Sequence, residues 1–133
     1  QASSNATITS RNSHSAVLTK DGNIIIFGGN SANDINHDFI ITAIPNLAIL
    51  NTNVSPYHWS VPNIPSTNAP PSLCYHSAAL YNNIMIITFG VQTSTKTANN
   101  NLYLFDVQNY VWISSSTNSS SQRISGHIIG IVV

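Results

Sequence analysis

Short apolar runs separated by polar turns dominate the first half of this chain. Apolar residues gather at positions 14–18, 24–28, 47–51 and 58–61, and none of these runs has the spacing of about 3.6 residues that a helix requires. Lys20-Asp21-Gly22-Asn23 separates the first two runs, and Asp-Gly is a strong hairpin signal. The pattern therefore predicts short antiparallel strands and little or no helix.

The second half of the chain repeats this pattern. His14-Ser-Ala-Val-Leu18 returns 62 residues later as His76-Ser-Ala-Ala-Leu80. Ile24-Ile-Ile-Phe-Gly28 returns at the same offset as Ile86-Ile-Thr-Phe-Gly90. Each copy is thus predicted to begin with two strands, of which the second ends in Phe-Gly.

A third and a fourth strand complete each copy. In the second copy they are expected at 102–106 and 111–114, and Trp59 and Trp112 occupy the fourth strands of the two copies. The two tryptophans are only 53 residues apart, so the first copy carries about nine more residues than the second. We place these extra residues at 32–45, between the second and third strands.

A further copy begins near the end of the sequence. Arg123-Ile-Ser-Gly-His127 echoes Arg11-Asn-Ser-His14, and an apolar run follows it. The chain is therefore expected to hold a lead, two complete units and the first strand of a third, at 1–10, 11–64, 72–114 and 122–133.

Units with four short strands, a His at the start, Phe-Gly-Gly after the second strand and a Trp in the fourth resemble the Kelch repeat. The second unit departs from the pattern, because Val91 stands where the second glycine is expected. The residues that carry the resemblance are Arg11, His14, Gly28, Gly29, Trp59, His76, Gly90, Trp112, Arg123 and His127. The resemblance implies an all-β fold, a partial Kelch-type β-propeller with four-stranded antiparallel blades.

The resemblance also implies roles for the repeated residues. The glycines would allow a close approach of backbones, and the tryptophans would lie as apolar plates between blades. The histidines would hydrogen-bond a loop of the same or the next blade. Two blades and one strand do not close a ring. We therefore expect the remaining blades to come from a longer chain or from other copies of this one.

Composition and charge exclude several classes of function. Only 6% of the residues are charged, against about 25% in ordinary soluble domains, and the four basic residues balance the four acidic ones. A chain without a basic stripe is not expected to bind nucleic acid, and without a basic cluster or a long apolar run it is not expected to contact a membrane directly.

The sequence predicts no catalytic, cofactor-binding or metal-binding residue. His14, His76 and His127 share one repeat position, which suits a repeated structural role better than a ring of metal ligands. No pair of carboxylates has a spacing that a motif recognises as an acid–base pair. Cys74 is the only cysteine and is followed by Tyr75. This is unlike the Tyr–Cys link between distant residues in galactose oxidase, so a secreted oxidase of that kind is kept only as an alternative.

The function that the resemblance implies is protein–protein interaction through loops. The connections at 30–46 and 91–101 both join second to third strands, so they should emerge on the same face. Phe39, Ile40 and Ile41 are unusually apolar for a loop and are candidate partner contacts, unless they extend the third strand or pack on the blade edge. A carbohydrate-binding propeller, with Tyr57 and Tyr75 on one face, and a self-assembling scaffold are the rival functions.

Three Asn-X-Ser/Thr triplets, at Asn5, Asn53 and Asn118, are possible glycosylation sites in expected loops or ends. They favour an extracellular protein or a membrane-protein ectodomain, with the cytoplasm as the alternative.

Overall fold

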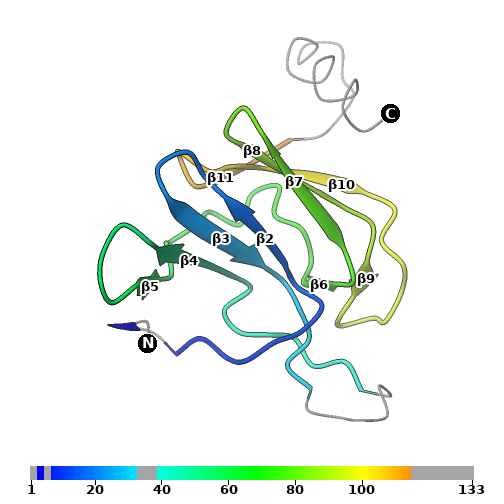
Figure 1. Ribbon diagram of the computed structural model, residues 1–133. Helices are drawn as coiled ribbons and strands as arrows, with labels where there is room; N and C mark the ends of the chain where they lie inside the picture. The colour runs from blue at the N-terminus through cyan, green and yellow to red at the C-terminus, as the bar shows by residue number, and fades with distance from the viewer. Residues whose placement is uncertain (1–2, 5–6, 33–38, 115–133) are drawn as a thin grey trace.

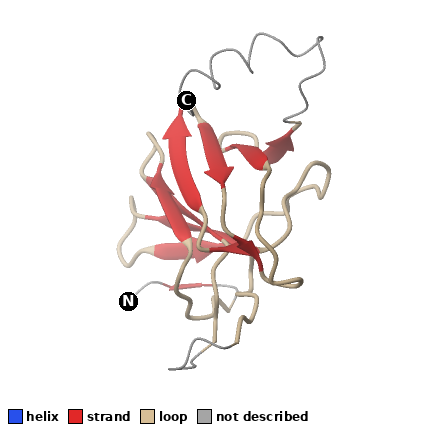
Figure 2. Ribbon diagram, turned by 90° about the vertical axis from the view of Figure 1, so that its right-hand side faces the viewer, coloured by secondary structure: helices blue, strands red, loops and turns tan. Residues whose placement is uncertain are grey.

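The structure is a computed structural model that describes residues 3–4, 7–32 and 39–114, and this part of the chain consists of strands and loops without a helix (Figures 1 and 2). The third unit expected from the sequence lies outside these ranges. So do four of the residues singled out above, namely Asn5, Asn118, Arg123 and His127.

The first sheet, blade 1, contains the four strands expected of the first unit. They are β2 (Ser15–Leu18), β3 (Asn23–Phe27), β4 (Leu47–Asn51) and β5 (His58–Ser60), and each pairs antiparallel with the next. A further strand, β1 (Ser3–Ser4), runs parallel to β5 along its outer edge. The sequence did not predict β1, because two serines carry no strand pattern. It covers part of an edge whose backbone groups would otherwise stay unpaired.

The second sheet, blade 2, repeats the arrangement. It contains β7 (Ser77–Tyr81), β8 (Ile84–Thr88), β10 (Leu102–Asp106) and β11 (Val111–Ile113), again all antiparallel and in the spatial order β11-β10-β8-β7. The fold is therefore a partial β-propeller of four-stranded antiparallel blades, as the sequence predicted. In Figure 1 the two blades lie beside each other, with β2 of blade 1 next to β7 of blade 2.

The two ends of the blades differ in character. One end, the turn face, carries the short hairpin turns. The other end, the loop face, carries the long connections between second and third strands, of which residues 28–32, 39–46 and 89–101 are described (Figure 1). The connection of blade 1 is the longer of the two, so most of its extra residues lie where the sequence placed them. At the loop face β6 (Leu73–Cys74), which leads into blade 2, pairs with β9 (Val91–Gln92) of that blade.

The first hairpins of the two blades have turns of different length. In blade 1 the chain turns through Lys20, Asp21 and Gly22, whose φ is 82°. In blade 2 it turns through Asn82 and Asn83 alone, with φ values of 44° and 63°. Two successive residues of positive φ make the two-residue type I′ turn that suits strand twist. The second hairpin is therefore one residue shorter than the first.

This missing residue shifts the register of the repeat. Ser15 pairs with Phe27, whereas the equivalent Ser77 pairs with Thr88, so Thr88 and not Phe89 takes the place of Phe27. The offset of 62 residues that the sequence suggests for the second strand is therefore wrong, because the structure gives 61. The two Phe-Gly pairs match as letters, but they do not occupy the same place in the blade.

The shift also changes which residues of blade 2 are equivalent to the two glycines of blade 1. Gly28 and Phe89 are equivalent, with φ values of 66° and 62°, and Gly29 and Gly90 are equivalent, with φ values of 106° and 85°. The expectation that Val91 replaces the second glycine is thus wrong. The first glycine is the one replaced, and Phe89 stands in its place.

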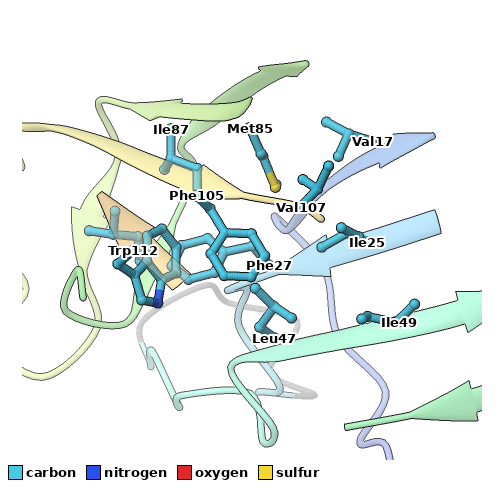
Figure 3. Packing of buried hydrophobic residues seen from close by; sticks show 11 residues of the cluster. Val17, Ile25, Phe27, Leu47, Ile49, Met85, Ile87, Phe105, Val107 and Trp112 are labelled. Carbon is cyan, nitrogen blue, oxygen red and sulfur yellow. The ribbon is translucent and has the colours of Figure 1, made fainter. Parts of the chain in front are cut away.

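The main apolar core lies between the two blades (Figure 3). The Trp112 ring meets Phe27 of blade 1 edge-on at 5.5 Å between ring centroids and Phe105 of its own blade at 4.8 Å. The buried residues of this core are Val17, Ile25, Phe27, Leu47, Ile49, Leu73, Met85, Ile87, Phe105, Val107 and Trp112. Trp112 therefore lies between blades, whereas Trp59, in the matching strand β5 of blade 1, is half-buried.

Strand alternation places a second apolar cluster on the opposite side of blade 2. Ile86 and Leu104 are buried there, and Ile84, Leu102 and Ile113 pack against them. The matching positions of blade 1, Ile25 and Ile49, belong to the core between the blades. On this side, blade 2 therefore has an apolar surface equivalent to the one that blade 1 packs against blade 2.

We expect Trp112→Ala to lower the free energy of unfolding by about 3–5 kcal/mol, because it removes the largest side chain from the core between the blades. Denaturant unfolding of the intact protein measures this change. Tyr57→Ala is the matched control, since Tyr57 is an exposed aromatic residue of a turn, and its effect should stay within about 0.5 kcal/mol. Similar losses for the two variants would contradict the packing described here.

Candidate functional site

His76 joins the two blades near the loop face. Its Nε2 lies 2.8 Å from the Ser15 hydroxyl of blade 1, and its ring meets the Phe27 ring edge-on at 5.2 Å. The side chain is only 8% exposed. The histidine at the start of blade 2 thus bonds to strand β2 of the preceding blade, whereas the resemblance implied a bond to a loop of the same or the next blade.

Gly28 makes room for this contact. A Cβ atom at position 28 would overlap the backbone carbonyl oxygen of Leu73 and lie 2.8 Å from Cε1 of His76. The next amide, that of Gly29, donates a hydrogen bond of 2.8 Å to the same Leu73 carbonyl. A second backbone bond runs from the Tyr75 amide to the Ser13 carbonyl at 3.0 Å. The segment that leads into blade 2 is therefore held against blade 1 by its backbone.

Arg11 supports the same corner from the other side. Its Nη1 donates to the Gly28 carbonyl at 3.0 Å and its Nε to the Thr9 carbonyl at 3.4 Å. Burial lowers the pKa of the Arg11 guanidinium. His14 is more exposed than His76, and partial burial and the charge of Arg11 lower its pKa. Arg11 therefore donates its hydrogen bonds to backbone carbonyl oxygens. The surroundings of both residues indicate a structural role.

A buried asparagine organises each long connection of the loop face. In blade 1 the Asn30 side-chain oxygen accepts hydrogen bonds from the amides of Ala32 at 3.0 Å and Ile41 at 2.9 Å. In blade 2 Asn99 Nδ2 donates to the carbonyls of Phe89 and Asn101, both at 2.9 Å. Neither residue was predicted from the sequence, because an asparagine carries no signal in a chain so rich in asparagine.

A side-chain hydrogen bond joins the two connections. The hydroxyl groups of Thr42 and Thr93 lie 2.6 Å apart, and the Thr93 hydroxyl also reaches the Ser72 carbonyl at 3.3 Å. The two connections therefore lie side by side on one face.

The apolar residues of the first connection point outward. Phe39 is 62% exposed and Ile41 is 55% exposed, while Ile40 is half-buried. Ile44, which no sequence pattern singled out, is 66% exposed. Strand β4 begins only at Leu47, so the expectation that residues 39–41 could extend the third strand is wrong.

The two carboxylates within the described ranges, Asp21 and Asp106, both lie at the turn face. Asp21 accepts hydrogen bonds from the Thr19 hydroxyl and the Asn23 side chain. Asp106 accepts hydrogen bonds from the amides of Gln108 and Asn109, and the bonds from Asn109 help to lower its pKa against the effect of burial. Each carboxylate thus stabilises a turn, and the two are not arranged as an acid–base pair.

The residues on which the rival functions depend lie apart. Tyr57 lies at the turn face and Tyr75 at the loop face, so the shared face of aromatic residues expected of a carbohydrate-binding propeller does not occur with this pair. Cys74 is buried, which raises the pKa of its thiol.

In residues 3–4, 7–32 and 39–114, no group of three His, Cys or Asp side chains is placed to hold a metal ion. The same ranges contain no helix long and apolar enough to cross a membrane.

The junction at His76 is expected to weaken in acid. Burial lowers the pKa of His76, a nearby positive charge on His14 acts in the same direction, and the backbone carbonyl of Phe27 opposes them. The unfolded chain, with its histidines near the ordinary value of 6.5, then takes up the proton more readily than the folded one. Stability should therefore be full above about pH 6.5 and fall as the pH decreases below it.

Urea unfolding of the intact protein between pH 8 and pH 5 measures this loss. His76→Gln keeps a polar group near Ser15 but does not titrate, so it should flatten the profile. His14→Gln is the comparison variant that retains His76. A His76→Gln profile as steep as that of the unchanged protein would contradict the role assigned to His76.

Comparison with known proteins agrees with this geometry. The family model described as the KLHDC2/KLHL20/DRC7 Kelch-repeats domain matches residues 1–132. No curated protein matches the chain. Kelch domains of this type are in general protein-interaction modules without enzymatic activity. The match covers almost the entire sequence, and each blade has four antiparallel strands, so this chain belongs to the family of KLHDC2/KLHL20/DRC7 Kelch-repeats domains.

Proposed function

We propose that this chain binds a protein partner through its loop face, at a surface formed by Phe39, Ile41 and Ile44, here called the loop-face patch. The observation that carries the proposal is the Thr42–Thr93 hydrogen bond, because it fixes the connection that bears the patch against the neighbouring blade. Function in repeat folds depends on such loops more than on the strands that present them.

The patch has the chemistry of a contact surface. All three of its side chains are more than half exposed, and burying apolar surface contributes roughly 25 cal/mol per Å². The described carboxylates lie at the opposite face, and Arg11 at the loop face is bonded to carbonyl oxygens. Lys96 is an exposed cation of the other connection of this face. The segment of the partner that contacts the patch itself is therefore best suited when it is apolar.

The patch is also held in place before a partner binds. Asn30 accepts a hydrogen bond from the amide of Ile41, and the Ser31 amide donates to the Ile41 carbonyl at 2.9 Å. The Thr9 amide and hydroxyl both donate to the Ile44 carbonyl. A contact surface that is already ordered loses less conformational entropy on binding, which favours affinity.

Site-specific cross-linking tests the proposal. A photoreactive benzoylphenylalanine replaces Ile41 in the intact protein, and a matched variant carries it in place of Lys20 at the turn face. We expect cross-linking in cells to join a defined protein to position 41 and not to position 20, and mass spectrometry to identify it. The same products from both positions would contradict a loop-face site.

The affinity of the cross-linked protein then provides a quantitative test. We expect Phe39→Ser combined with Ile41→Ser to weaken binding by roughly tenfold or more, because two apolar contacts are lost. Val54→Ser combined with Tyr57→Ser, two exposed residues of the turn face, is the control and should leave the affinity unchanged. Calorimetry with the purified proteins measures both, and equal affinities for the two double variants would refute the proposed surface.

We also propose an extracellular or ectodomain location, with the cytoplasm as the alternative. It is supported by the exposed position of Asn53 in a turn. Asn53→Gln should remove one glycan, which is seen as a gel shift after treatment with a glycosidase. An unchanged mobility of the untreated and treated protein would contradict this location.

A further inference from the structure

Phe89 has a backbone conformation that aromatic residues rarely adopt. Its φ is 62°, in the left-handed region, and its equivalent in blade 1 is Gly28. A bulky residue with positive φ is an outlier, and such strain is found most often where it contributes to function. The ring of Phe89 is also 68% exposed, the largest exposed fraction among the large apolar side chains described.

Packing does not offset this strain. Tyr110 also has a positive φ, of 54°, but its ring stacks on Phe105 at 6.4 Å and is half-buried. Tyr75, with a φ of 58°, keeps the conformation of its equivalent Ser13. For Phe89, residues 7–32 and 39–114 provide no ring–ring contact. The conformation therefore holds an aromatic ring in solvent at a cost in stability.

Phe89 also prevents a following blade from docking as blade 2 docks on blade 1. At Gly28 the Leu73 carbonyl and the His76 ring occupy the space into which a Cβ atom would extend. Phe89 places a Cβ atom and a ring at the equivalent point of blade 2. The same close backbone approach is therefore excluded there.

The position of Phe89 links it to the loop-face patch. It opens the connection 89–101, its carbonyl accepts the hydrogen bond from Asn99, and the same connection carries Thr93, which bonds to Thr42 beside the patch. Phe89 thus extends onto blade 2 the apolar, exposed character of the patch on blade 1.

We propose that Phe89 is a partner-contact residue, whose ring inserts between the side chains of an apolar segment of a protein partner bound at the loop face. This rests on the proposed function, because it assigns a second contact to the same face. Phenylalanine in place of glycine excludes a close junction with a following blade. It also gives the loop face an exposed aromatic side chain, the type of residue that dominates binding at interfaces.

Thiol labelling tests the exposure of Phe89 without any partner. In the intact protein, Phe89→Cys should react with a maleimide about as fast as Lys96→Cys, which lies in the same connection and is exposed. The native Cys74 is the buried control within the same molecule. If Cys at position 89 reacts as slowly as Cys74, a following blade covers the site and the proposal is wrong.

Binding and stability together test the contact itself. The probe is a phage-displayed peptide library selected on the intact protein, from which the tightest peptides are synthesised. We expect Phe89→Gly to weaken their binding at least tenfold without lowering the unfolding temperature, because glycine tolerates the backbone conformation. Gly28→Ala, the matched change at the equivalent position, should lower the unfolding temperature by several degrees, since its Cβ atom would overlap the Leu73 backbone.

The outcomes separate this inference from the proposed function. Peptides whose binding is lost with Phe39→Ser and Ile41→Ser but kept with Phe89→Gly would retain the loop-face patch and overturn the role of Phe89. Binding that survives all three changes, or a selection that enriches no peptide, would overturn both. A Phe89→Gly variant that loses stability together with binding would show a structural residue and not a contact.

Discussion

The close approach of two backbones at Gly28 is the constraint on which the junction of the blades depends. With a hydrogen at this position, the Leu73 carbonyl reaches the Gly29 amide and the His76 ring reaches Ser15 and Phe27. The core between the blades, with Trp112 against Phe27, lies beside this junction. Backbone geometry at one glycine thus determines how two large apolar surfaces meet.

Much of this fold could be predicted from the sequence, because alternation and repetition are local signals. The eight blade strands lie within a few residues of their expected positions, and Trp112 lies between blades. The register of β8 was not predictable by matching letters, since Phe-Gly occurs in both units. Turn length determined the register, through the positive φ values of Asn82 and Asn83.

The candidate site was predictable only in part, for a related reason. Phe39 and Ile41 are visible as apolar letters in a polar loop, and the structure leaves both exposed. The groups that hold the loop, Asn30, Asn99 and the Thr42–Thr93 pair, are common polar residues whose role depends on contacts across the fold. Ile44 and Phe89 were missed because their significance lies in exposure and backbone conformation, which no pattern of letters records.

The two-residue turn of blade 2 shows how repeats can diverge without altering their strands. If the unchanged chain turned through three residues, Asn82, Asn83 and Ile84, Ser77 would pair with Phe89. Phe89 would then take the place that Phe27 occupies, and the Phe-Gly pair would be back in step with the first unit. The length of a turn at one face thereby determines which residue lies at the opposite face, at the far end of the strand. In an array of repeats, a turn of two residues in place of three, in an unchanged sequence, is therefore enough to put another residue at a buried packing position.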